Sequence, residues 1–270
     1  MSDPVPFIEA LKQLRARGLL PTSWDTARLR ELDAAVRRQS FFSAQTTETG
    51  LLAEYKGIIE NIVEPGTEQR ADRETASNPS GFTTTGFNPA TARAHIKDFL
   101  DRIGYQPEKG KAGTLLDLSS DKRVDLVVKT NVQLSHGAGR FIQENADPDV
   151  VDLFPALELV RFEDRKEPRD WEQRWRIASS TVGDVDAARC LGLQGRMCAL
   201  KSSEIWQALG DGAGGYQDTL GNPYPPFAFN SGMWTEEVSR DEAEDLGLLG
   251  KGEKAEPAAF SLASLFSKAA

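Results

Sequence analysis

The apolar positions in the first half of the chain recur every three or four residues, which is the spacing of amphipathic helices. Ser23 or Asp25 can cap the second of these helices, and Ser119 or Ser120 can cap the last. The pattern predicts helices over residues 6–18, 25–36, 41–62, 89–103 and 120–143. We therefore expect the N-terminal half to be helical throughout.

Residues 64–88 interrupt this periodicity. They are mostly charged and small polar residues around Asn78-Pro79-Ser80-Gly81, followed by three threonines. Clusters of Pro, Gly, Asn and Ser favour turns and loops. An exposed loop is predicted here.

The pattern changes after Asp147-Pro148. Residues 157–162 alternate enough to predict a strand. Trp171 and Trp175 lie four residues apart on an expected short helix, and further helices are predicted over residues 199–209 and 241–249. Residues 210–215 form a Gly-rich loop, and the prolines of residues 221–233 predict an ordered or adhesive loop instead of a helix.

These elements predict an α+β fold, with a helical N-terminal half followed by a compact mixed α+β domain. The expected divisions are a mainly helical region over residues 1–110, the mixed domain over 111–250, and a linker with a short amphipathic tail over 251–270. The tail carries Phe260, Leu262, Leu265 and Phe266, which could bind a partner.

Composition narrows the possible functions. The 270 residues are 39% hydrophobic, and 32 Lys and Arg against 41 Asp and Glu give a formal net charge of -9. An acidic chain repels phosphate backbones, so general coating of nucleic acid is disfavoured, although a local basic patch could exist between Arg161 and Arg176. No apolar run is long enough to span a bilayer, and no membrane partner is expected.

Few residues are candidates for catalysis. His136 with Cys190 or Cys198 could form a nucleophile pair only if the fold brought them within hydrogen-bond reach. We expect two reduced, buried, inert thiols instead, because the cysteine spacing fits neither a disulfide framework nor a zinc site. The Gly137–Arg140 run indicates close helix packing and lacks the pattern of a phosphate loop. We therefore predict no catalytic, cofactor-binding or metal-binding residue, and no enzyme.

The segment from Arg161 to Arg176 combines arginines with an aspartate and two tryptophans. Arg over Trp would place a cation on an aromatic ring, and Asp170 could pair with an Arg. One interpretation is an anion-binding or active site. The other, which we favour, is a polar cluster that fixes a loop against an indole.

Several motifs in order resemble the head-morphogenesis domain of Mu-type phages. They are Thr130-Asn131-Val132-Gln133, then Gly137 to Arg140, then Phe154-Pro155-Ala156 with Arg161, and finally Tyr224-Pro225-Pro226-Phe227-Ala228-Phe229-Asn230. The resemblance covers about Leu115 to Leu249. Many members continue with a Cys-x-Cys pair, whereas this chain has Ser231-Gly232-Met233, so no metal or redox role of such cysteines carries over.

The resemblance implies a minor capsid protein of a bacteriophage or prophage, a structural protein of the virion head made in the bacterial host cytoplasm. It implies phage portal and major capsid proteins as partners, and possible contact with packaged DNA. A hydrolase or toxin-like effector using His136 or the Arg161–Asp170 region, and a DNA-binding module, remain alternatives. The structural or interaction candidates are Thr130, Asn131, Gln133, Arg140, Arg161, Arg165, Arg169, Asp170, Trp171, Trp175, Pro225, Pro226, Phe227, Phe229 and Asn230.

Overall fold

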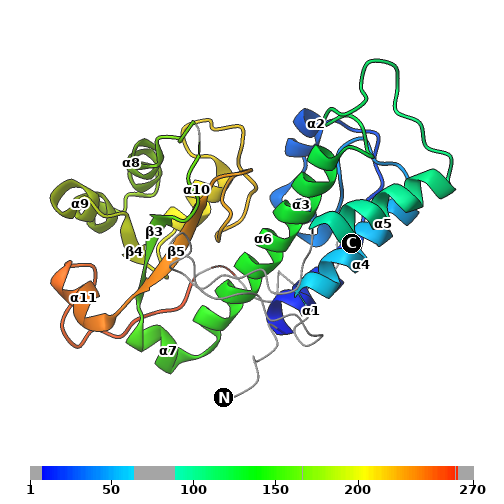
Figure 1. The fold of residues 1–270 in the computed structure, drawn as a ribbon. Helices are drawn as coiled ribbons and strands as arrows, with labels where there is room; N and C mark the ends of the chain where they lie inside the picture. The colour runs from blue at the N-terminus through cyan, green and yellow to red at the C-terminus, as the bar shows by residue number, and fades with distance from the viewer. Residues whose placement is uncertain (1–7, 64–88, 166, 259, 261–270) are drawn as a thin grey trace. The chain divides into compact units, whose positions relative to one another are not determined.

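The computed structural model describes residues 8–63, 89–165, 167–258 and 260 (Figure 1). These residues form two compact units that divide inside one long helix, between Gly139 and Arg140. We call the described residues up to Gly139 the helical unit and those from Arg140 onward the mixed unit. The sequence placed this boundary earlier, at residue 110.

The helical unit contains most of the predicted helices. Its elements are α1 (Ile8–Ala16), β1 (Gly18–Leu19), α2 (Thr26–Arg30), α3 (Ala34–Gln39), β2 (Ser40–Phe41), α4 (Thr49–Val63), α5 (Pro89–Arg102) and the greater part of α6 (Asp121–Ala146). Ser120 caps α6, because its Oγ accepts the N–H of Arg123 at 3.2 Å. Helices α1, α4, α5 and α6 confirm the periodic pattern.

Two predictions for this unit were wrong. The expected helix 25–36 is two short helices, because Asp33 caps α3 by accepting the N–H of Ala35 at 2.7 Å. Phe41 does not open a helix. It lies in β2, which pairs in parallel with β1, so the N-terminal half is not helical throughout.

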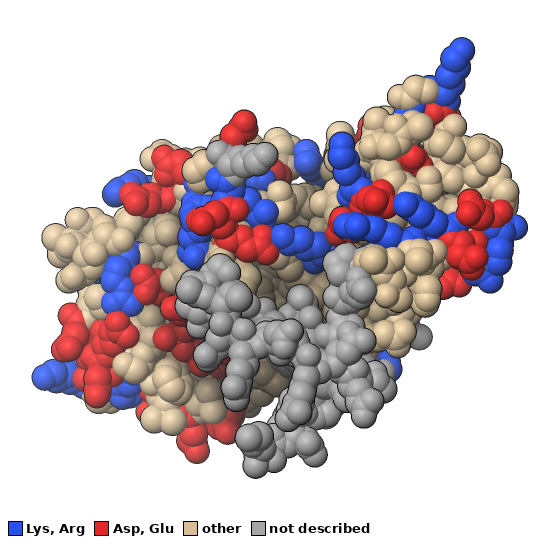
Figure 2. Space-filling view, in the orientation of Figure 1, with Lys and Arg blue, Asp and Glu red and all other residues tan. Residues whose placement is uncertain are grey.

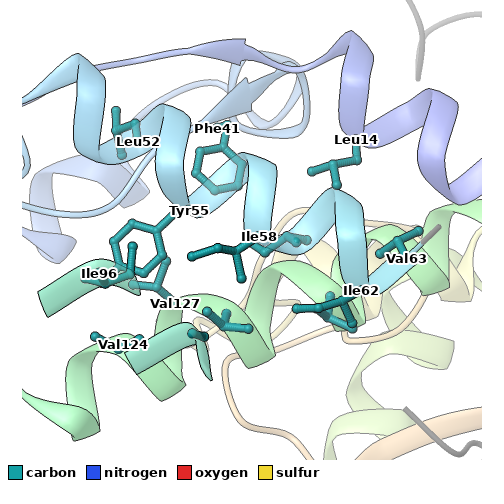
Figure 3. Close-up of a cluster of buried hydrophobic side chains, with 14 of the residues drawn as sticks. Leu14, Phe41, Leu52, Tyr55, Ile58, Ile62, Val63, Ile96, Val124 and Val127 are labelled. Carbon is teal, nitrogen blue, oxygen red and sulfur yellow. The ribbon is translucent and has the colours of Figure 1, made fainter. Parts of the chain in front are cut away.

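The core of the helical unit is mainly aliphatic (Figure 3). Apolar side chains of α4 face those of α1, α5 and α6, and Phe41 of β2 joins them. Close packing is also visible at Gly139, where a β-carbon would lie 2.6 Å from the backbone nitrogen of Ala10. This contact confirms the predicted close helix packing at Gly139.

The mixed unit combines a small sheet with short helices. Its elements are the end of α6, α7 (Pro148–Leu153), β3 (Ala156–Arg161), α8 (Trp171–Val182), α9 (Val185–Gln194), β4 (Cys198–Leu200), α10 (Ile205–Asp211), β5 (Met233–Val238) and α11 (Arg240–Asp245). The strand order is β4-β3-β5, and β3 is antiparallel to both neighbours. Figure 1 shows α8, α9 and α10 grouped beside this sheet.

Alternation along β3 explains how the sheet is covered. Leu157 and Leu159 join the cluster formed by α8, α9 and α10, whereas Ala156 joins a second cluster with Val238 and the two cysteines. Successive side chains of a strand point to opposite faces, so both faces of β3 are used. The α+β class predicted from the sequence is confirmed.

Two predictions for the mixed unit need correction, and one strand was missed. The expected helix 199–209 is β4 followed by the shorter α10, and β5 was not predicted at all. The linker expected from residue 251 is anchored: Ala255 is buried and its N–H donates to Asp152 Oδ1 at 3.4 Å. The loop predicted at 64–88 and most of the C-terminal tail lie outside the described residues.

Candidate functional site

The site candidates fall into both units. Thr130, Asn131 and Gln133 lie on the part of α6 in the helical unit. Asn131 is 5% exposed and serves the fold: its Oδ1 accepts from Arg17 Nη1 at 3.0 Å and its Nδ2 donates to Val127 O at 2.8 Å. Thr130 and Gln133 are half-buried on the same helix. Arg140, in the mixed unit, pairs with Glu144 one turn later.

The remaining candidates gather around one loop of the mixed unit, residues 221–232, which we call the Pro-Pro loop. Residues 221–228 are all buried, which confirms an ordered loop. The Pro225-Pro226 peptide bond is cis. The backbone of the loop bonds to the segment before it, because Leu220 N–H donates to Phe227 O at 3.0 Å and Phe229 N–H to Asp218 O at 2.9 Å.

Stacked aromatic rings hold the loop from inside. The Trp175 and Trp206 rings meet edge-on with centroids 5.3 Å apart, and Phe227 stacks on Trp206 at 6.1 Å. Each indole N–H has a carbonyl partner: Trp175 donates to Ala187 O at 3.2 Å and Trp206 to Leu200 O at 2.8 Å. The rings therefore tie the Pro-Pro loop to α8, α10 and the edge of the sheet.

Arg169 holds the same loop from outside. Its Nη2 donates to Phe229 O at 2.7 Å and its Nη1 to Asn230 O at 3.3 Å. Its Nε lies 2.9 Å from Asp218 Oδ2. A guanidinium with several donors in a fixed plane can hold two carbonyls and a carboxylate at once.

Asp218 also pairs with a second arginine. Arg174 donates to both carboxylate oxygens, at 2.9 and 3.0 Å, and its guanidinium lies over the rings of Trp171 and Tyr216, at 5.0 and 4.0 Å. Burial alone would raise the pKa of Asp218, but the bonds and charges of Arg174 and Arg169 hold that pKa below its ordinary value. The carboxylate is ionised at neutral pH and joins α8 to the segment before the Pro-Pro loop.

Three further candidates make local contacts. Arg161 donates to Arg169 O at 3.4 Å, and Arg165 pairs with Glu163 at 2.6 Å. Among the described residues Asp170 forms no ion pair with an arginine, contrary to the sequence-based suggestion: it caps α8 by accepting the N–H of Gln173 at 2.8 Å. The carboxylate of an N-cap aspartate accepts hydrogen bonds from the helix amides. Asp218, and not Asp170, forms the ion pairs with Arg169 and Arg174.

The nucleophile candidates are assigned to different units. His136 lies in the helical unit and both cysteines lie in the mixed unit. Burial lowers the pKa of His136 to about 4, and burial, Glu158 and Cys190 raise the pKa of the Cys198 thiol. Both cysteines are free and buried, as predicted. The Cys198 thiol is therefore not activated as a thiolate at neutral pH.

The described residues contain no group of three or more His, Cys, Asp or Glu placed to hold a metal ion, and no helix long and apolar enough to cross a membrane. On the face drawn in Figure 2, Lys and Arg are interleaved with Asp and Glu.

No protein-family model, curated protein sequence or solved structure matches this chain significantly.

Sequence reasoning identified the arginines and aromatic residues of this cluster but missed the acid that joins them. Asp218 stands in a loop without periodicity and is 44 residues from Arg174. It also missed Lys201, whose side chain is fully buried and pairs with Glu237 at 2.9 Å. No local pattern marks either residue, because each finds its partners only in the folded chain.

Proposed function

We propose that this chain is a minor head protein of a tailed bacteriophage or prophage, associated with the portal and carried in the virion head in few copies. Its partners would be the portal and major capsid proteins, with possible contact to packaged DNA. The proposal begins from the ordered motifs between Thr130 and Asn230 that resemble the head-morphogenesis domain of Mu-type phages.

One structural observation carries the proposal further. The last two motifs of the resemblance, which are far apart in the sequence, meet through Arg169. Arg161 belongs to the motif that begins at Phe154, and it donates to Arg169 O. The Arg169 side chain in turn donates to the carbonyls of Phe229 and Asn230, which end the motif that begins at Tyr224. Motifs that build one connected framework are what a shared domain architecture requires.

The same contacts support a structural role over a catalytic one. The guanidinium groups of Arg169 and Arg174 share Asp218, and Asp170 caps a helix. These groups are engaged in holding a loop against indoles, which is the interpretation favoured from the sequence.

The decisive experiment is incorporation into particles. The tagged chain is produced together with its portal and major capsid proteins, and assembled heads are purified and analysed by quantitative mass spectrometry. We expect recovery with the portal and presence in heads at low copy number. Absence from both heads and portal complexes would remove the proposal and favour the enzyme or effector alternative.

A matched pair of variants connects this result to the framework. Arg169→Ala removes the bonds to the Pro-Pro loop, whereas Arg176→Ala removes an exposed arginine of α8 whose pair with Glu172 spans 3.8 Å. We expect reduced incorporation for the first and unchanged incorporation for the second. Binding of the purified chain to duplex DNA with a steep salt dependence, but no portal binding, would favour the DNA-binding alternative.

A further inference from the structure

The mixed unit contains a cavity of about 590 Å³ beside α10. Its apolar walls come from several segments and include Phe141 of α6, Val182 of α8, Trp206 and Ala208 of α10, and Pro223 of the Pro-Pro loop. Small-molecule sites typically measure about 300 to 1,000 Å³ and combine apolar and aromatic walls with a few polar groups. The cavity has the size and the apolar walls of a small-molecule site.

Two acidic side chains of α10 stand at this cavity. Glu204 and Asp211 both line it, together with Gln207 and Ala208. Residues spaced by three and four positions lie on the same face of a helix, so one face of α10 presents both acids to the cavity. Both acids are exposed, and Gln207 Nε2 holds Asp211 by donating to its Oδ1 at 2.7 Å. The charged groups that α10 contributes to the wall are therefore acidic.

The cavity offers these acids no cation of its own. In the described part of the chain, neither Glu204 nor Asp211 forms an ion pair, and Glu204 does not cap α10. Lys201 is the only basic residue among the described residues that line the cavity. Its ammonium is already bonded to Glu237 Oε1 at 2.9 Å and to Glu144 O at 3.1 Å. The two carboxylates at the cavity are thus left without a positive partner.

The end of α10 adds negative charge to the same wall. Asp211 is the last residue of α10, and Gly212 and Ala213 beyond it also line the cavity. The carbonyls at a helix C-terminus carry a partial negative charge, which favours a nearby cation and disfavours an acid. Asp211 therefore stands where its charge does not stabilise the helix. A cation in the cavity would be attracted by the helix end and by both carboxylates.

We propose that this cavity binds a small organic cation, an amine or a guanidine with an apolar body. The body packs against Trp206 and Val182, and the positive charge lies beside Glu204 and Asp211. Walls contributed by α6, α8, α10 and the Pro-Pro loop fit a free small molecule, whereas a partner protein would require an extended surface. This inference goes beyond the proposed role in the phage head and does not depend on it.

An NMR titration of the full chain with two probes tests the selection for positive charge. Phenethylamine and phenylpropionate carry the same phenylethyl body with opposite charges. We expect saturable binding of the amine with a Kd of about 1 mM, and binding of the carboxylate at least about tenfold weaker. Absence of saturable binding by the amine, or equal affinity for the two probes, would overturn the proposal.

Substitutions of the acids test whether they hold the charge of the ligand. Glu204→Gln and Asp211→Asn each remove one negative charge and keep the shape of the side chain. We expect each to weaken phenethylamine binding about fivefold, the upper range for an exposed ion pair. Glu172→Gln, which removes an exposed acid at the other end of α8 from the cavity, is the matched control and should leave the affinity unchanged. An equal loss in the control would mean general attraction to an acidic protein, and the proposal would fail.

A second pair of variants locates the ligand. Ala208→Leu enlarges an apolar side chain of the cavity wall and leaves both acids in place, whereas Ala188→Leu makes the same change at an exposed position of α9. We expect the first to weaken phenethylamine binding at least about tenfold, because it fills space that the apolar body needs, and the second to retain it. Circular dichroism verifies that both variants are folded. Unchanged affinity in a folded Ala208→Leu variant would place the ligand elsewhere and overturn the proposal.

Discussion

The helical unit and the mixed unit bury different kinds of side chain. In the helical unit, the core consists mainly of Leu, Ile and Val repeated along four helices (Figure 3). In the mixed unit, Trp175, Trp206 and Phe227 form an aromatic cluster, and Asp218 joins Arg169 and Arg174. The first core depends on area removed from water, whereas the second also depends on directional contacts.

This difference determines how each unit should respond to change. Apolar burial is non-directional, so the helical unit tolerates small rearrangements of its side chains as long as its volume is filled. An ion pair that loses one partner leaves a charge without compensation, so the mixed unit should be sensitive to single polar substitutions. Cys190 and Cys198, both buried in the mixed unit, make thiol labelling a specific probe of its unfolding.

The largest expected effect is a pH dependence of the free energy of unfolding of the helical unit. Burial lowers the pKa of His136 from 6.5 to about 4 in the folded state, so folding favours the neutral imidazole. The contribution of the neutral His136 to the free energy of unfolding is fully present above the unfolded pKa of 6.5. It is lost as the pH falls toward 4, because the unfolded chain binds the proton more readily. We expect a loss of about 3 kcal/mol in the free energy of unfolding across this window.

Urea unfolding followed by far-UV circular dichroism measures this loss. The measurements are made at about pH 7.5, 5.5 and 4, which run from above the unfolded pKa of His136 to its folded pKa. His136→Gln should remove most of it. His95→Gln, at an exposed position of α5, is the matched control and should retain it. A pH dependence that survives His136→Gln would assign the effect to another group.

The second effect is specific to the mixed unit. Asp218→Asn keeps the shape of the side chain but leaves Arg169 and Arg174 without their carboxylate. Because the Asp218 side chain is 25% exposed, we expect a loss of about 2 kcal/mol, less than the 3–5 kcal/mol typical of a fully buried pair. Labelling of the two cysteines should accelerate, and the helical unit should be unaffected.

Asp186→Asn is the matched control for this substitution. Asp186 pairs with Arg189 at 2.8 Å on α9, and both side chains are almost half exposed. Exposed pairs contribute at most about 1 kcal/mol, so labelling should change little. Equal effects of the two substitutions would show that Asp218 contributes no more than a surface pair.

The contrast between the units also explains which helices and strands could be predicted from the sequence. Helices α4, α5 and α6 follow from periodic apolar positions, because a helix that buries one face must repeat that face. Two-residue strands such as β1 and β2 are too short to show a repeat of apolar positions. The break between α2 and α3 was missed because the apolar positions continue across Asp33, which caps α3.

In the mixed unit, the sequence located β3 and α8 but not the contacts that organise them. Strand β5 pairs along the full length of β3, from Ala156 opposite Val238 to Arg161 opposite Met233, and this partner is distant in sequence. The arginine and tryptophan cluster was recognisable from residue type. Its acid was not, because Asp170 was the nearer candidate and Asp218 reaches the cluster only through the fold.

The smallest effects compare two helical glycines, one in each unit. In the helical unit, a β-carbon at Gly139 would lie 2.6 to 2.8 Å from backbone and side-chain atoms of Ala10, so α1 must shift to admit it. In the mixed unit, Gly192 of α9 has nothing within 4 Å of that position. Alanine is the better helix former by about 1 kcal/mol, and overpacking costs about 1–3 kcal/mol.

Gly139→Ala should therefore lower the free energy of unfolding by about 1 kcal/mol, as the difference of these opposing effects, and Gly192→Ala should raise it by about 0.5 to 1 kcal/mol. Urea unfolding monitored by circular dichroism measures the first, and cysteine labelling measures the second. If Gly139→Ala were also stabilising, α1 and α6 would have to separate at little cost, and the close helix packing inferred from this glycine would not contribute to stability.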